Sequence, residues 1–472
     1  MRQRVSPRGS VRVAGPWLIA MLLLVAPVIA WIAAGDDERR LLEPFANATG
    51  AVQSFSKTGR IDSSNPFFQS LGTNGRACVH CHQASAGWTV APSELQNRFE
   101  TTQGLDPIFR SNDGANSPLA DVSTVEARRH AFSMLLSKGL IRVGLGIPDN
   151  AEFTLEAVDD PYGFASSHEL SLFRRPLPST NVAFLSTVMW DGRETFPGKT
   201  VSFDLLNQSN DATVGHSQAS LPLSADQRDQ IVEFETNLFT TQVYDFAAGD
   251  LRAQGGRGGP KVLSREDFFI GINDPLGLNP KKLAFNPVVF TDFAAWAKLT
   301  SPEADDEEEG QARSEARLAV ARGEALFNGK RINITGVAGL NDDLNVAVIP
   351  GTCGTCHDTP NAGNHSVPAP LNIGLADASR RTPDMPLYTL KNKATRQTVQ
   401  TTDPGRALVS GRWKDIGRFK GPILRGLAAR APYFHNGSAR TLVDAVRFYN
   451  DRFSIGLSEA EVSDFVAFLR VQ

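Results

Sequence analysis

The chain has 472 residues, enough for two or three domains that each bury a core of their own. It is 41% hydrophobic and 21% charged, which is the composition of an ordinary globular protein. A formal net charge of -3 argues against nucleic acid as a partner, whereas a redox partner would respond to local patches of charge and is not excluded.

The N-terminal segment has the pattern of an export signal. Four arginines within the first twelve residues precede an almost wholly apolar run over 16–34, and acidic residues end that run. Such a segment is a cleaved signal peptide or, because its length is close to the roughly 20 residues that span a bilayer, an uncleaved membrane anchor. We therefore expect residues 1–35 to be a signal peptide or anchor and the rest of the chain to be periplasmic.

The remaining sequence predicts helices separated by long loops, with little of the alternation that strands require. Capping boxes and amphipathic spacing predict helices at five places: 122–138, 224–244, 314–327, and onward from Thr441 and from Ser458. The expected fold class is mainly α, with two cytochrome c-like haem domains that carry long loops and insertions.

An acidic run after residue 300 has no apolar spacing, so it predicts a solvated linker. We place an N-terminal haem domain at 36–300, the linker at 301–313 and a C-terminal haem domain at 314–472.

All four cysteines fall in two copies of one motif. Both copies follow the pattern C-x-x-C-H, which is typical of covalent c-type haem attachment: Cys78, Cys81 and His82 in the first, and Cys353, Cys356 and His357 in the second. The two thiols of each copy would form thioethers to haem, and the histidine would bind the iron. Three other roles of such cysteines are disfavoured. A zinc ribbon usually has its cysteine pairs about 15–20 residues apart, whereas these pairs lie at 78–81 and 353–356. A redox-active pair needs a strand–helix setting, and a disulfide across two residues is strained.

Two further strings accompany the motifs. They are Trp190-Asp191-Gly192-Arg193 and Ala431–Ser438 (APYFHNGS). In this order the four signatures resemble the bacterial di-haem cytochrome c peroxidase and MauG family, over roughly residues 60–472 with an expanded middle. The resemblance implies that peroxide reacts at the N-terminal haem and that the C-terminal haem passes or stores electrons.

The resemblance assigns two aromatic residues. Trp190 matches the family's bridging tryptophan between the haems, although a buried tryptophan in a domain interface would give the same pattern. Tyr449 falls where peroxidases of the family carry a methionine ligand and MauG-type enzymes carry a tyrosine. A phenolate ligand would lower the potential of the second haem. The alternative is that Tyr449 packs on the haem edge while Met385 or His365 binds the iron.

The first haem needs an acid–base group to break the O–O bond. His216 falls near the family's catalytic glutamate, and His168 lies near the spacing of a displaceable histidine ligand. Arg174 and Arg175 precede Trp190, where the family supplies an asparagine to a calcium ion. Because Arg175 aligns with that asparagine, calcium is doubtful, and these arginines would instead bind haem propionates.

His435 would support a haem propionate or the loop near Tyr449.

Three functions follow from these assignments. The first is a di-haem peroxidase that reduces hydrogen peroxide with electrons from a small redox protein. The second is a MauG-type oxidase of a protein or organic substrate, and the third is a plain electron carrier. We expect a peroxide-using oxidoreductase.

Overall fold

The computed structural model describes residues 38–300 and 307–472. The predicted export segment lies outside the described residues, as does the start of the acidic run. Among the described residues, no helix is long and apolar enough to cross a membrane. The structure is 33% helical and 15% strand, so the expectation of a mainly helical chain is not confirmed.

The principal helices and the strands follow in chain order. The helices are α2 (Pro92–Thr102), α3 (Val125–Ala131), α4 (Ser133–Lys138), α5 (Val201–His216), α6 (Ala225–Thr236), α7 (Pro260–Leu263), α8 (Glu307–Gly329), α9 (Ala407–Ser410), α10 (Leu442–Phe453) and α11 (Glu459–Arg470). The strands are β1 (Phe45–Asn47), β2 (Gly50–Ser56), β3 (Ile141–Leu145), β4 (Phe153–Asp159), β5 (Leu170–Arg174), β6 (Leu238–Asp245), β7 (Gly249–Asp250), β8 (Ile332–Thr335), β9 (Val348–Gly351), β10 (Leu387–Asn392) and β11 (Thr398–Thr401).

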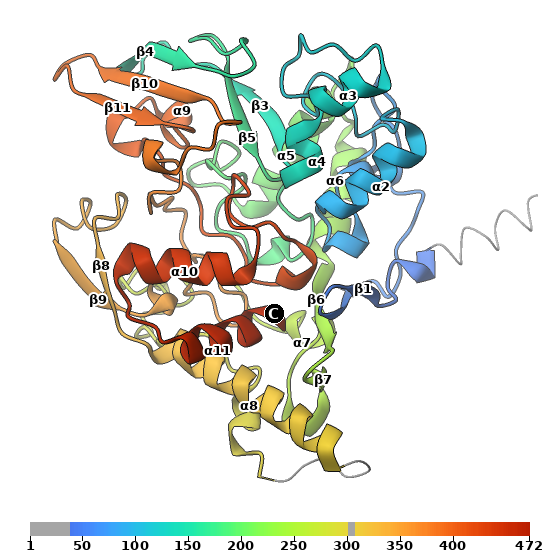
Figure 1. Cartoon of the computed structure of the whole chain (residues 1–472), viewed down its shortest axis with the longest axis vertical. Helices are drawn as coiled ribbons and strands as arrows, with labels where there is room; N and C mark the ends of the chain where they lie inside the picture. Colours follow the sequence, from blue (N-terminus) through green and yellow to red (C-terminus); the bar gives the residue numbers. More distant parts are fainter. Residues whose placement is uncertain (1–37, 301–306) are drawn as a thin grey trace, which may run out of the picture.

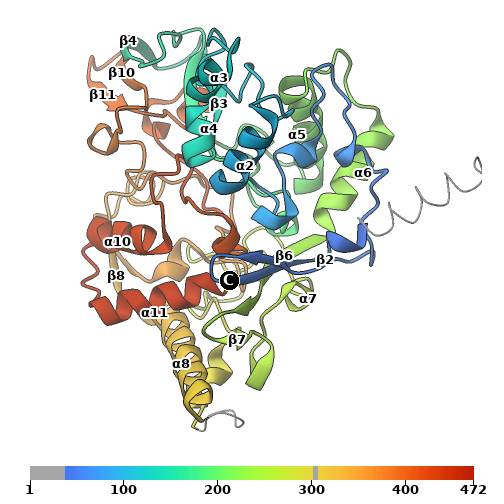
Figure 2. The same cartoon turned by 45° about the vertical axis from the view of Figure 1, so that its right-hand side comes forward.

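The strands form a four-stranded sheet in the order β1-β2-β6-β7, a three-stranded sheet β11-β10-β4, and the pairs β3-β5 and β8-β9. Figure 2 shows β2 beside β6, with α7 next to them. The pairing of β4 with β10 joins segments from either side of the predicted linker. The division into two haem domains stays a prediction, and this sheet crosses it.

Three predicted helices have different bounds in the structure. The helix over 122–138 is divided at Phe132 into α3 and α4, because the Asn116 side chain enters the turn and bonds Ser133 Oγ and the Met134 N–H. The capping box at Ser224 is confirmed, but α6 ends at Thr236 and the chain continues as β6.

The helix predicted over 314–327 is longer than expected, since α8 begins at Glu307. The part of the predicted linker from 307 to 313 is therefore helical. The helices predicted from Thr441 and Ser458 are confirmed with both capping boxes formed.

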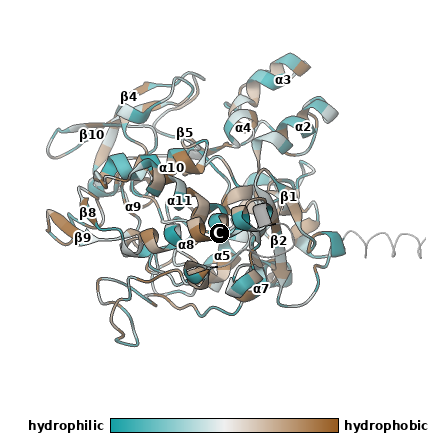
Figure 3. Ribbon diagram, turned by 60° about the horizontal axis from the view of Figure 1, so that its bottom comes forward, coloured by the Kyte–Doolittle hydropathy of each residue, from teal (hydrophilic) through white to brown (hydrophobic). Residues whose placement is uncertain are grey.

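The largest hydrophobic cluster holds the C-terminal helices together. In Figure 1, α10 and α11 lie next to each other with α8 against α11. Phe290, Phe327 and Phe468 meet edge to face or tilted at the centre of this cluster, with ring centroids 5.0–5.8 Å apart. Figure 3 shows hydrophilic residues interspersed with hydrophobic ones along α2, α3 and α8, as expected of helices with one face in solvent.

Candidate functional site

The two C-x-x-C-H motifs adopt the same local backbone. Each begins with one turn of 3-10 helix at its first cysteine. In each, the N–H of the motif histidine donates to the carbonyl of that cysteine at 3.0 Å, His82 to Cys78 and His357 to Cys353. All four cysteines are free thiols. Burial raises the pKa of Cys78 and of Cys353 to about 12 each, which favours the neutral thiol in both.

Both motif histidines are held in the same way. His82 Nδ1 lies 3.0 Å from the carbonyl oxygen of Trp88, and His357 Nδ1 lies 2.6 Å from that of Gly363, in each case six residues further along. An Nδ1–H that donates to a carbonyl leaves Nε2 as the nitrogen that can bind a metal. Burial lowers the pKa of His82 to about 4 and also lowers that of His357, which keeps both rings in the neutral form that iron requires.

The first motif opens into a cavity that we call the N-terminal cavity. It is lined by Cys78, Cys81 and His82 together with one face of α5. Residues three or four apart share a face of a helix, and the α5 residues that line this cavity follow that spacing: Leu205, Gln208, Ser209, Ala212, Thr213 and His216. The face carries apolar and small polar groups and ends in a histidine.

His216 is oriented by a buried acid. Its Nδ1 lies 2.5 Å from Asp113 Oδ2, and the other oxygen of Asp113 accepts from the Arg76 guanidinium. Burial works to raise the pKa of Asp113, but the Arg76 charge and the His216 hydrogen bond outweigh it and hold this pKa below its usual value. Because Nδ1 is committed to Asp113, His216 keeps Nε2 for a ligand in the cavity. Sequence reasoning missed Asp113 and Arg76, which lie 103 and 140 residues from His216.

His168 does not join this site. Its side chain is exposed, and it lines neither this cavity nor the one at the second motif. The residue precedes β5, on a loop whose His168 carbonyl approaches Gly146. The structure thus places His168 on a surface loop outside both cavities, and its role as a displaceable ligand stays a prediction.

Glu235 is a buried carboxyl in the N-terminal cavity that sequence reasoning missed. It lies at the end of α6 with 6% of its surface exposed, and its Oε2 has no hydrogen-bond partner among the described residues. Burial raises its pKa to about 7. A carboxyl with such a pKa can exchange a proton at neutral pH, although it is close to Cys78 rather than to His216.

The second motif opens into the C-terminal cavity, lined by Cys353, Cys356 and His357. Tyr449 on α10 lines it as well, and burial raises the pKa of its phenol, with a further contribution from Cys356 and Cys353. Met385 and His365, the alternative ligands predicted from sequence, do not line this cavity. Tyr449 is thus the predicted ligand that lies beside the motif.

His435 lies on the wall of the C-terminal cavity with 1% of its surface exposed. Its ring stacks on Phe419 with centroids 3.9 Å apart, and neither ring nitrogen has a partner among the described residues. Burial lowers its pKa to about 4. Two buried, unpartnered ring nitrogens at this wall fit a bound group with polar atoms, such as a haem.

Trp190 lines both cavities. Its indole Nε1–H donates to the carbonyl of Arg175 at 2.8 Å, and its ring meets the ring of His435 edge to face at 6.2 Å. Its position between the two motif cavities is the one expected of a bridging residue.

Arg174 serves a different role from the one predicted. Its guanidinium donates to both oxygens of Asp403 at 2.7 and 2.9 Å and to Asp191 at 2.6 Å, and all three side chains are at most 2% exposed. Two carboxylates therefore already balance this cation, and it has no charge left over for a propionate. The Asp191 of the Trp-Asp-Gly-Arg string instead ties that string to β5 through Arg174.

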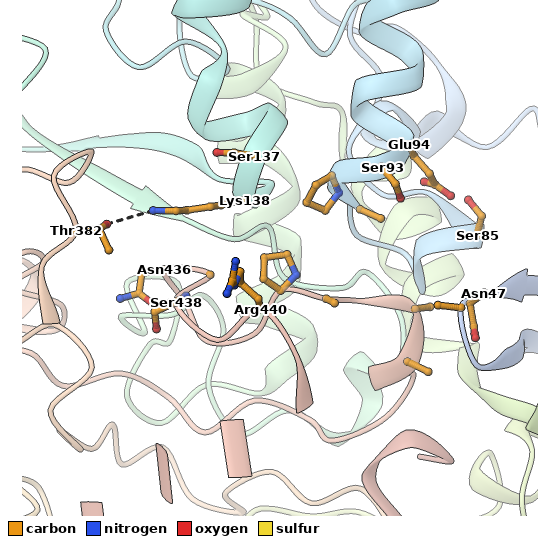
Figure 4. Close-up of a pocket in the computed structure, with 18 of the residues that line it drawn as sticks. Asn47, Ser85, Ser93, Glu94, Ser137, Lys138, Thr382, Asn436, Ser438 and Arg440 are labelled. Atoms are coloured by element: carbon orange, nitrogen blue, oxygen red, sulfur yellow. Dashed lines mark hydrogen bonds between the residues drawn. The ribbon is translucent and has the colours of Figure 1, made fainter. Parts of the chain in front are cut away.

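A third cavity of about 730 Å³ lies where α2, α4 and the 428–440 segment meet (Figure 4). Lys138 on its wall donates to Thr382 at 3.2 Å, and Arg440 lies across from it. It contains none of the motif cysteines or histidines and shares Pro432 with the C-terminal cavity. Because it lacks both motifs, this cavity is not where a haem would attach.

Comparison with known proteins finds partial sequence matches. The chain is 31% identical over 168 residues to cytochrome-c peroxidase IdrP1 of Denitromonas iodatirespirans, which is 31% of this chain and 38% of that protein. It is 31% identical over 150 residues to cytochrome-c peroxidase IdrP1 of Pseudomonas sp. (strain SCT), which is 30% of this chain and 33% of that protein. Over these stretches the chain is similar to cytochrome-c peroxidases.

The match is partial. The chain spans 33–38% of the length of these curated relatives, and no family model matches it. A crystal structure of a MauG-like protein associated with microbial copper homeostasis covers 80% of this chain and 88% of its own, at 16% identity and a TM-score of 0.32. A TM-score this low does not establish a shared fold. The similarity to cytochrome-c peroxidases therefore rests on the sequence matches alone.

Proposed function

We propose that this protein is an exported di-haem oxidoreductase that reduces hydrogen peroxide to water with electrons relayed between two covalently bound haems. The observation that carries this proposal is that Trp190 lines two cavities, each of which holds a C-x-x-C-H motif of the same geometry. The electron donor would be a small redox protein. Residues 1–35 would direct the chain to the periplasm and would either be removed or anchor it.

Each cavity would hold one haem through its motif. Cys78 and Cys81 would attach the first and His82 Nε2 would bind its iron, and Cys353, Cys356 and His357 would do the same for the second. When bound, the first haem supplies an iron that accepts peroxide and transfers electrons to it. Reduction of one peroxide to two waters consumes two electrons and two protons.

His216 would handle the proton of the O–O cleavage. With Nδ1 bonded to Asp113, His216 Nε2 would be free to take a proton from one oxygen of peroxide and to deliver it to the other. Asp113 holds the ring in one tautomer and stabilises its protonated form, and Arg76 holds Asp113. Trp190 would carry electrons between the cavities.

A second candidate function is a MauG-type oxidase that uses peroxide to oxidise a protein or organic substrate. Tyr449 favours it, because a phenolate ligand stabilises oxidised iron and would make the second haem a poor electron store. A plain electron carrier is disfavoured, since a carrier has no use for an oriented acid–base pair on one cavity wall.

Low-temperature EPR of the oxidised protein, before and after one equivalent of hydrogen peroxide, tests the proposal. We expect a high-spin ferric signal that peroxide consumes, together with a low-spin signal that changes in Tyr449→Phe. Two low-spin haems that stay inert to peroxide after one-electron reduction would contradict both enzyme functions.

A further inference from the structure

Two buried cations and one half-buried cation lie where the two motif cavities meet, and none has an acidic partner among the described residues. Arg175, Lys420 and Arg430 line both the N-terminal and the C-terminal cavity. Arg175 is 5% exposed and Lys420 is 7% exposed, whereas Arg430 is half-buried. We call these three side chains the junction cluster.

The junction cluster binds backbone carbonyls only. The Arg175 guanidinium donates to the carbonyls of Val90 and Arg430 at 2.7 and 3.0 Å, and to the carbonyl of Lys138 at 3.0 Å. Lys420 Nζ donates to the carbonyl of Thr187 at 3.0 Å.

The third member, Arg430, donates to the carbonyls of Gly426 and Ile423 at 3.2 and 3.0 Å. No ion pair joins any of the three to an Asp or Glu of the described residues, in contrast to Arg174 with its two carboxylates.

Carbonyl dipoles satisfy the hydrogen-bonding atoms but do not neutralise the charges. Burial lowers the pKa of Lys420 to about 7 and that of Arg175 to about 9, and in both cases the charge of Arg430 lowers it further. A buried cation without a counter-ion is costly, and three side by side also repel one another. The chain alone therefore leaves net positive charge at the junction.

We propose that the junction cluster is a shared binding site for the propionate carboxylates of both haems. This inference rests on the proposed function only in that it requires two attached haems. Each haem carries two propionates at the edge of its ring, and carboxylates are among the anions that guanidinium and ammonium groups bind well. Among the described residues, no Asp or Glu lines the C-terminal cavity to serve in their place.

The junction cluster would also couple the haems to Trp190. The carbonyl of Arg175 accepts the Trp190 indole N–H, and the Lys420 N–H donates to the Trp190 carbonyl at 2.9 Å. The backbones of two cluster residues thus hold the bridging ring. A cation shared by both haems stabilises the reduced form of each, so its removal lowers both midpoint potentials.

The test is Lys420→Met in the full-length haem-loaded protein, with an optical redox titration of each haem and haem content measured by the pyridine haemochrome assay. We expect two haems per chain, a fall in both midpoint potentials, and recovery of both in Lys420→Arg. The matched control is Lys414→Met, because Lys414 is exposed and pairs with Asp343 at 2.9 Å, and we expect it to change neither potential.

A change in only one potential, or in neither, with two haems still attached would overturn the shared site. Arg430→Gln is the second variant if Lys420→Met does not fold, with the same expectation. Each titration is repeated over a range of phosphate and of acetate concentration. Potentials of the wild type that depend on these anions would show that the cluster binds an anion from solution and would overturn the propionate assignment. Fewer than two haems per chain in the wild type would instead contradict the proposed function.

Discussion

The substitution His216→Asn tests the roles of the two ring nitrogens of His216 separately. The amide nitrogen of asparagine stands at the same distance from Cβ as Nδ1 of histidine, so it can still donate to Asp113 while the position of Nε2 is empty. If Nε2 transfers the proton of peroxide cleavage, the variant keeps the local structure and loses the chemistry. His216→Gln has the opposite design, since its longer side chain reaches toward the cavity but gives up the bond to Asp113.

The expected loss of rate in His216→Asn follows from the proposed acid–base role of His216. A positioned acid–base group contributes about 10²–10⁴ in rate, which corresponds to about 3–5 kcal/mol of activation free energy. The effect on folding is small in comparison, because the His216 side chain is 38% exposed and such partly exposed ion pairs contribute about 1 kcal/mol or less. We therefore expect kcat/KM for peroxide to fall by about 10²–10⁴ with the melting temperature nearly unchanged.

Stopped-flow reaction of the reduced protein with hydrogen peroxide measures this loss. The matched control is His168→Asn, the same substitution at an exposed histidine outside both motif cavities, which should react like the wild type. If His216→Asn reacts within about threefold of the wild type, then His216 is not the acid–base group, and Glu235 becomes the candidate in the same cavity.

Three further results are expected. Trp190→Phe should retain both haems and slow electron transfer between them by an order of magnitude or more, seen by flash photolysis, and an unchanged rate would place the electron path elsewhere. Asp403→Asn leaves the buried Arg174 with one carboxylate and should cost about 3–5 kcal/mol of unfolding free energy in urea, whereas a loss below about 1 kcal/mol would contradict the network. Glu235 has a folded-state pKa of about 7 against an ordinary value of 4.5, so the folded protein loses stability as pH rises through this window. Glu235→Gln should remove this loss and gain roughly 3 kcal/mol relative to the wild type at pH 8 but not at pH 4, and equal pH profiles would contradict the raised pKa.

The parts of this structure that depend on neighbouring residues could be predicted from the sequence. The capping boxes at Ser224, Thr441 and Ser458 begin helices where expected, because the reciprocal bonds of a capping box span only three residues. The two motif turns are equally local. The end of α6 could not be placed, since the residues after Thr236 become strand only through pairing with β2.

The sheets were missed for a related reason. In β2 the buried residues alternate with half-buried ones, but the inward positions include Ser54 and Ser56, so the pattern does not look hydrophobic. Ser54 is buried because it bonds Thr240 and accepts from the Trp88 indole. A polar residue that faces inward to satisfy a distant partner carries no signal in a single sequence.

Distant partners also explain why Arg174 and Arg175 have different contacts. Adjacent arginines before Trp190 were both expected at propionates, yet one is neutralised by Asp191 and Asp403 and the other meets only carbonyls. Asp403 lies 229 residues along the chain from Arg174, and nothing in the local spacing reveals it. Successive residues of a strand point to opposite faces, and this alternation at the end of β5 is what gives the two cations their different roles.

The two cavities share one motif geometry but differ in what surrounds it. Proton-carrying groups line the N-terminal cavity, where His216 is held by Asp113 and where Glu235 is buried with no partner for its Oε2 among the described residues. Among the described residues the wall of the C-terminal cavity has no carboxylate, and it offers Tyr449 and the neutral His435 instead. Under the proposed function, the reaction that consumes protons would take place in the first cavity, and the haem in the second would exchange only electrons. The proposed electron path between the two cavities would run through Trp190, which lines both of them.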